Sequence, residues 1–105
     1  MTSPIDIRSN DLKIVQQILA DALPKNAKVW VFGSRATWKT KRSSDLDLAI
    51  DAGRALTRNE NSALADAFDE SDLPYKVDVV DMHNVTNTFK AIIERQMLPL
   101  EWQSL

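Results

Sequence analysis

The chain has 105 residues, of which 44% are hydrophobic and 27% are charged, and these values predict one globular domain over residues 1–105. A formal net charge of -2 gives no reason to expect direct nucleic-acid binding, and the absence of cysteine with a single histidine excludes disulfides, thiolate metal sites and histidine-rich zinc sites. No apolar run approaches the ~20 residues of a membrane span, and the N-terminus lacks the basic start and apolar stretch of a signal peptide, so a cytoplasmic protein without membrane contact is expected.

The first half of the chain predicts a helix followed by a strand. Within residues 9–23, Val15 and Leu19 belong to an apolar series at helical spacing, whereas polar residues such as Asp11 are expected on other faces. Residues 28–32, which are rich in valine and aromatic side chains, then predict a buried strand.

The second half predicts a helix, a strand and a last helix. Thr57 and Glu60 form a capping-box pattern, which indicates that a helix starts there. A short strand is expected over residues 76–81, and the last helix from residue 85 or 86 to 97. The inward faces of the two helices are expected to carry Ala63, Leu64, Ala67 and Phe68 in the first and Phe89, Ile92, Ile93 and Met97 in the second.

The element order α-β-(α)-β-α-β-α predicts an α/β sandwich with a small mixed sheet of three to four strands flanked by helices. If Gly33 at the end of the first strand and Asp45 at the start of the second reach one site, these two strands run antiparallel. The helix-containing crossover to the third strand permits a parallel pair. We therefore expect Asp45, Asp47 and Asp78 to gather at one end of the sheet.

Asp45 and Asp47 are the first candidates for chemistry. They lie two residues apart at the start of an apolar strand, so both side chains point to the same face. Two such charges buried without partners would be costly, and a divalent cation held by oxygens resolves that cost. For this fragment alone, the alternative is a turn with an aspartate cap that continues into a strand.

Gly33 and Ser34 follow the first strand directly. A glycine lets backbone N–H groups approach phosphate oxygens closely, and the serine hydroxyl adds a donor. The alternative is a simple turn that ends the strand, and a lone Gly-Ser pair does not decide between the two.

The joint spacing of these pieces resembles a known family signature. Gly33-Ser34-Arg35-Ala36 and then Asp45-Leu46-Asp47, with ten residues between Ser34 and Asp45, resemble the signature of the nucleotidyltransferase superfamily typified by DNA polymerase β. In its size and its Phe-Gly-Ser-Arg-Ala start, the chain resembles the minimal nucleotidyltransferase (MNT) subfamily. Asp78 matches the position of that family's third carboxylate. The resemblance runs from the first helix to about Leu100, which is nearly the whole chain.

The resemblance implies a nucleotidyltransferase fold and a two-metal chemistry. Asp45 and Asp47 would hold two Mg²⁺ ions that bridge the triphosphate of ATP, and Asp78 would share the catalytic ion and help to deprotonate the attacking hydroxyl. Gly33 and Ser34 would position the β- and γ-phosphates. Catalysis would then be electrostatic stabilisation of an in-line displacement, without a covalent enzyme intermediate.

Other acidic and imidazole side chains are weaker candidates. Asp81 lies three residues after Asp78 and faces the opposite side of a straight strand, where it is expected to cap the following turn. Asp51 shares the face of Asp47 but lies about 13 Å along the strand, which is too far for the same metal ion. His83 is expected to be structural.

Basic residues are expected near the triphosphate. Arg35, Lys39 and Arg42 would offset the phosphate charge, and a solvated loop is the alternative for each of them. Trp38 stands where many members of the resembled family have glycine. It would stack on adenine or on a partner surface, or it would narrow the nucleotide site.

The residues after Asp81 suffice for one helix and a short tail, so the acceptor is expected on another chain. In the resembled family that chain is a small helical HEPN toxin, and some members silence it by transferring AMP from ATP to a tyrosine hydroxyl. The resemblance implies such an antitoxin, in a hetero-oligomer or a homodimer. Two alternatives remain: neutralisation by binding alone, and nucleotidyl transfer to a small hydroxylated molecule such as an aminoglycoside. The tail side chains Leu98, Leu100, Trp102 and Leu105 would face a partner or seal the core.

Overall fold

The computed structural model describes residues 5, 7–37 and 45–102. Its elements are α1 (Ser9–Ala22), β1 (Lys28–Phe32), α2 (Ser34–Thr37), β2 (Leu46–Asp51), α3 (Arg58–Asp69), β3 (Val77–Asp81), α4 (Asn87–Glu94) and β4 (Leu98–Pro99). The predicted helices and strands are present, except that the last helix ends at Glu94 rather than at residue 97. The two-residue β4, for which no residue range was predicted, brings the sheet to four strands, within the predicted three to four. Among the described helices, none combines the length and apolar character that crossing a membrane requires.

The strands form one mixed sheet in the order β3-β2-β1-β4. β1 and β2 are antiparallel, with Phe32 opposite Asp47. β2 and β3 are parallel, with Asp47 opposite Asp78. Both predicted strand orientations are therefore confirmed, and the start of β2 meets the start of β3 at one edge of the sheet.

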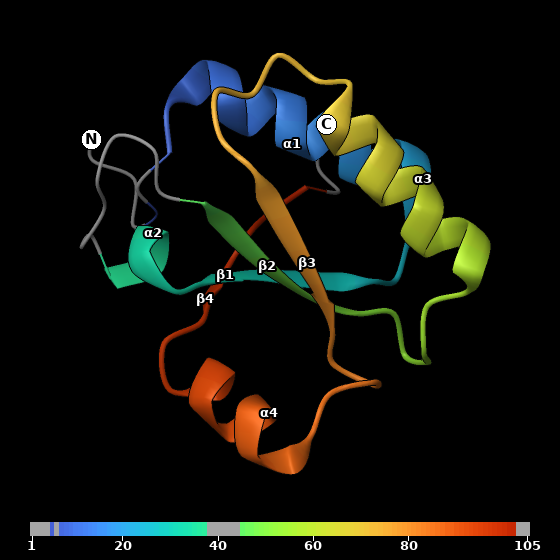
Figure 1. Ribbon diagram of the computed structural model, residues 1–105, viewed down its shortest axis with the longest axis vertical. Coiled ribbons are helices and arrows are strands. Elements are labelled where there is room, and N and C mark those ends of the chain that lie inside the picture. The colour runs from blue at the N-terminus through green and yellow to red at the C-terminus, as the bar shows by residue number, and fades with distance from the viewer. Residues whose placement is uncertain (1–4, 6, 38–44, 103–105) are drawn as a thin grey trace.

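The two faces of the sheet are covered unequally. α1 and α3 pack against each other over one face, and α4 alone lies over the other (Figure 1). The larger core, under α1 and α3, includes Val31 and Leu48, both fully buried. The smaller core, under α4, consists of Phe32, Ala49, Met82 and Ile93. Because side chains alternate along a strand, Asp47 and Asp78 lie on the α4 face.

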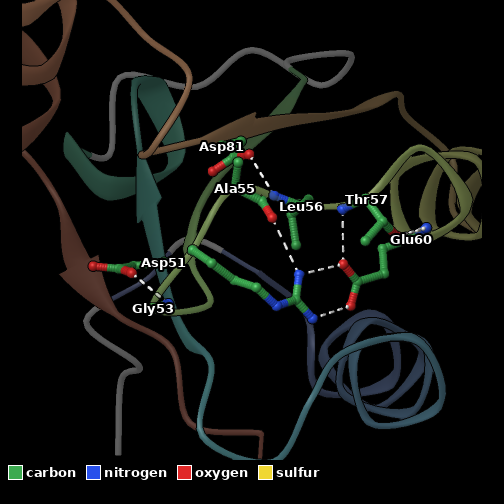
Figure 2. Close-up of polar contacts among 8 residues, drawn as sticks. Asp51, Gly53, Ala55, Leu56, Thr57, Glu60 and Asp81 are labelled. Atoms are coloured by element: carbon green, nitrogen blue, oxygen red, sulfur yellow. Dashed lines mark hydrogen bonds and ion pairs between the residues drawn. The ribbon is translucent and has the colours of Figure 1, made fainter.

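The start of α3 confirms the predicted capping box. The Thr57 hydroxyl accepts from the Glu60 N–H at 3.1 Å, and the Glu60 carboxylate accepts from the Thr57 N–H at 2.8 Å. Arg54 donates to both Glu60 oxygens, at 2.7 and 3.0 Å (Figure 2). The hydrogen bonds from Arg54 and Thr57 lower the pKa of Glu60 to about 2.

Asp81 is buried at the end of β3, where it has the structural role predicted for it. Its carboxylate accepts from the backbone N–H of Leu56 at 2.7 Å (Figure 2) and from that of His83 at 2.9 Å. His83 is also structural, because its Nε2 lies 2.6 Å from Oδ1 of Asp51. The backbone N–H of Gly53 and the side chain of His83 lower the pKa of Asp51, which lies at the opposite end of β2 from Asp47.

Several predicted burial assignments are wrong. Asp11 is buried, with 9% exposure, because it precedes Val15 by one helical turn and shares its stripe. Phe89 and Ile92 are 40% and 47% exposed, since the short α4 presents only part of its apolar surface to the sheet. Ala63 is exposed as well.

The tail residues after α4 seal the core. Leu100 and Trp102 are buried in the larger core, and Leu98 packs against it. This supports the core-sealing alternative for these three side chains, while residue 105 lies outside the described part of the chain.

Candidate functional site

An acidic edge of the sheet carries the three predicted carboxylates. Asp45 is exposed just before β2, Asp47 is partly buried within β2, and Asp78 is exposed on β3. The parallel register sets Asp78 directly opposite Asp47. The topology therefore brings together acidic residues that are far apart in the sequence, as the spacing predicted.

Asp47 is the residue whose ionisation is most disturbed at this edge. Burial raises its pKa, and the charges of Asp78 and Asp45 raise it further, from 3.8 to about 6. Each of these causes disfavours the charged carboxylate. Among the described residues, burial and the two neighbouring carboxylates thus make the charged form of Asp47 costly.

The side chains at this edge fit a hard divalent cation in kind and in charge. All three donors are carboxylate oxygens, which Mg²⁺ prefers. The raised pKa of Asp47, caused first by burial and then by the charges of Asp78 and Asp45, reflects a cost of the charged carboxylate that a cation would offset. Within residues 5, 7–37 and 45–102, no group of three or more acidic or imidazole side chains is arranged to hold an ion by itself. A cation here would therefore need further oxygen ligands, such as those of a phosphate.

Gly33 packs its backbone against the Asp47 carboxylate. It joins β1 to α2 with a φ of +73°, a conformation that residues with a Cβ rarely adopt. A Cβ at this position would overlap Oδ2 of Asp47 and lie 3.3 Å from its Cγ. The backbone conformation therefore favours glycine, and the close approach places the predicted phosphate loop in contact with a predicted metal ligand, which would have to move if a Cβ were added.

Arg35 is held in a polar cluster beneath this loop. Its side chain is only 7% exposed, and its Cζ lies 3.9 Å from the centroid of the Tyr75 ring. The Tyr75 hydroxyl donates to Oδ2 of Asp11 at 3.1 Å. Burial and then the charge of Asp11 raise the pKa of Tyr75. The cluster ties α1, α2 and the segment before β3 together, and the phosphate-binding role of Arg35 stays a prediction.

The remaining predicted site residues have different positions. Ser34 is partly buried as the first residue of α2, next to Gly33, and its role toward phosphate also stays a prediction. Lys39, Arg42 and Trp38 lie outside the described residues. A hollow of about 390 Å³ between residues 27–30 and 99–102 is lined from the other end of β1, so it is not part of the acidic edge.

Sequence reasoning missed three polar residues that the fold brings near the loop. The Tyr75 ring lies against Arg35 and its hydroxyl donates to Asp11, and Gln96 accepts a hydrogen bond from the Gly33 N–H at 3.0 Å. The position of Asp11 on the stripe of Val15 was a signal available in the sequence. Gln96 gave no local signal, because its partner lies 63 positions away.

Comparison with known proteins identifies relatives along most of the chain. Residues 13–99 match the family described as polymerase beta, nucleotidyltransferase. The chain is 43% identical over 91 residues to the probable protein adenylyltransferase MntA of Haemophilus influenzae, and the alignment covers 87% of this chain and 79% of that protein.

Solved structures share the fold. A crystal structure described as a toxin–antitoxin with AMP-PNP superposes with a TM-score of 0.73 at 26% identity, covering 90% of this chain and 75% of that one. A toxin–antitoxin MntA–HpeT mutant superposes with a TM-score of 0.68 at 27% identity, covering 92% and 76% respectively. The mixed sheet with its flanking helices is thus a fold that this chain shares with these two structures.

Proposed function

Because the chain belongs to the polymerase β nucleotidyltransferase family, we propose that it transfers AMP from ATP to a tyrosine hydroxyl of a HEPN toxin and so acts as the antitoxin. The tyrosine oxygen would form a bond to the α-phosphorus while the bond to the β-phosphate breaks and pyrophosphate leaves, and the reaction would depend on Mg²⁺. The observation that carries this proposal is the contact of Gly33 with Asp47, which stands opposite Asp78 on the neighbouring strand. A phosphate-binding turn and paired carboxylates at one edge are the parts that nucleotidyl transfer needs.

Different residues would act on the nucleotide and on the acceptor hydroxyl. Gly33 and Ser34 would position the β- and γ-phosphates, Gly33 through the close backbone approach that a residue without a Cβ allows and Ser34 through its hydroxyl. Asp78 is exposed, so it is available to accept the proton of the attacking hydroxyl. The negative charge around Asp47 would favour a divalent cation at this edge, and without one it would repel the triphosphate.

The metal ligands would be Asp45 and Asp47, with Asp78 sharing one ion. When bound, Mg²⁺ would neutralise triphosphate charge and stabilise the charge that develops on the transferred group. Triphosphate oxygens would complete the ligand set that the described side chains do not complete alone.

The relatives support a partner chain as acceptor. The Haemophilus influenzae relative is named a probable protein adenylyltransferase, and the two structural relatives are described as toxin–antitoxin proteins, one of them with AMP-PNP. By this analogy the protein would work in a hetero-oligomer with its toxin, in the cytoplasm.

Transfer of label from ATP tests the proposal. The chain is incubated with the HEPN toxin proposed as its partner, Mg²⁺ and ATP labelled in the adenosine, and label on the toxin is measured. We expect labelling by the wild-type chain and none by the folded Asp45→Asn/Asp47→Asn double variant. An unlabelled toxin, together with protection of cells by that double variant, would instead indicate neutralisation by binding alone.

A further inference from the structure

Gln96 links the C-terminal part of the fold to the predicted phosphate loop. It lies between α4 and β4 and is partly buried. Its Oε1 accepts the backbone N–H of Gly33 at 3.0 Å. The hydrogen bond therefore connects the turn after α4 with the Gly33 turn after β1. In the proposed function the Gly33 turn holds the triphosphate.

The backbone on both sides of Gln96 is fixed. The N–H groups of Gln96 and Met97 donate to the carbonyl of Ile93 at 3.0 and 2.9 Å, and Ile93 is fully buried. After this turn, Leu98 pairs with Val31 in the sheet. The carboxamide of Gln96 is thus presented from a well-anchored position, as a group that orients another must be.

The Gly33 turn, which supplies the donor of this hydrogen bond, has little conformational freedom. Gly33 is in the left-handed region and its Cα packs against the Asp47 carboxylate. A shift of this turn would therefore also change the space available to the Asp47 side chain. Gln96, Gly33 and Asp47 therefore form one continuous chain of contacts from the end of α4 to the acidic edge.

We propose that Gln96 is a positioning residue for the nucleotide. Its carboxamide holds the Gly33 turn in the conformation that receives the triphosphate and keeps that turn against Asp47. The identity of the ligand rests on the proposed function, whereas the control of the Gly33 turn by Gln96 can be measured without any reaction.

The composition of the chain allows a direct measurement of the turn. It contains two glycines, Gly33 and Gly53, so isotope labelling of glycine nitrogen gives two backbone amide signals by NMR. Gly53 donates to Oδ1 of Asp51 at 2.8 Å, far from Gln96 along the sheet, and is the internal reference. In Gln96→Leu we expect the Gly33 signal to shift and its hydrogen exchange to accelerate about tenfold, while the Gly53 signal stays unchanged.

Two further variants control for unrelated effects. Gln17→Leu makes the same chemical change at an exposed residue of α1, whose side-chain amide donates to Asp21 at 3.1 Å, and it should leave the Gly33 signal unchanged. Gln96→Glu retains an acceptor at the same reach and should restore slow exchange at Gly33. An unchanged Gly33 signal in Gln96→Leu would overturn the proposal.

The functional measurement separates binding from chemistry. Gln96→Leu should raise KM for ATP about fivefold, the loss expected for one hydrogen bond, with kcat within about twofold of the wild-type value. A KM equal to that of the wild type, with a loosened Gly33 turn, would overturn the positioning role. If the wild-type chain transfers no AMP, the proposed function fails, and titration of the Gly33 signal with Mg-ATP replaces KM. Equal dissociation constants for the two chains would then overturn the inference.

Discussion

Gly33→Ala would place a methyl group where the Asp47 carboxylate now lies. The φ of +73° adds backbone strain, which costs about 1 to 2 kcal/mol for a residue with a Cβ. The overlapping atom is the end of a side chain, so Asp47 can rotate away and the overlap itself adds little to the loss of stability. That rotation moves the carboxylate away from its position opposite Asp78, and we expect this displacement to lower the rate of AMP transfer.

Gly53→Ala is the matched control, because Gly53 has a φ of +80° and a Cβ added there would meet open space. Both variants should lose about 1 to 2 kcal/mol of unfolding free energy in urea titrations. Only Gly33→Ala should lose AMP transfer, by about a hundredfold, since a displacement of about 1 Å in a reacting group has that effect. Equal losses of activity in the two variants, or full activity in Gly33→Ala, would refute the reasoning.

Three more substitutions test the electrostatics of the fold by urea titration. In the absence of metal ions, Asp47→Asn should raise the unfolding free energy by about 1 to 2 kcal/mol near neutral pH, because the pKa of Asp47 is raised to about 6. A raised pKa in the folded state destabilises the chain only as the pH rises through it, so this gain should vanish at acidic pH. A gain that does not depend on pH would contradict this. Asp81→Asn should lower the unfolding free energy by about 2 kcal/mol, because the Asp81 carboxylate accepts hydrogen bonds from Leu56 and His83. It should leave AMP transfer unchanged. Glu60→Gln should lower the unfolding free energy by at most about 1 kcal/mol near neutral pH. Its lowered pKa of about 2 means that this difference fades as pH falls, and a difference that persists in acid would contradict the assignment.

The sequence predicted what depends on local pattern. Helical spacing and a capping box located α1 and α3, and the requirement that Gly33 and Asp45 reach one site predicted the antiparallel β1–β2 pair. The long crossover predicted the parallel β2–β3 pair, from which the juxtaposition of Asp47 and Asp78 follows.

The missed features depend on contacts between distant residues. Asp11 is a polar residue on an apolar stripe, and its burial is possible because the hydroxyl of Tyr75, 64 positions away, gives it a hydrogen bond. The contact of Gln96 with Gly33 depends on the placement of α4 and β4 together. Periodicity carries no information on such pairs, so only the folded arrangement reveals them.

The most direct test of the proposed reaction is the fate of the individual phosphates of ATP. The chain and its toxin are incubated with Mg²⁺ and with ATP labelled at either the α- or the γ-phosphate. Transfer of AMP predicts that toxin tyrosine acquires label from the α-phosphate and none from the γ-phosphate, and that Asp47→Asn abolishes this labelling. Label from the γ-phosphate, or α-label that persists in Asp47→Asn, would contradict nucleotidyl transfer at this acidic edge.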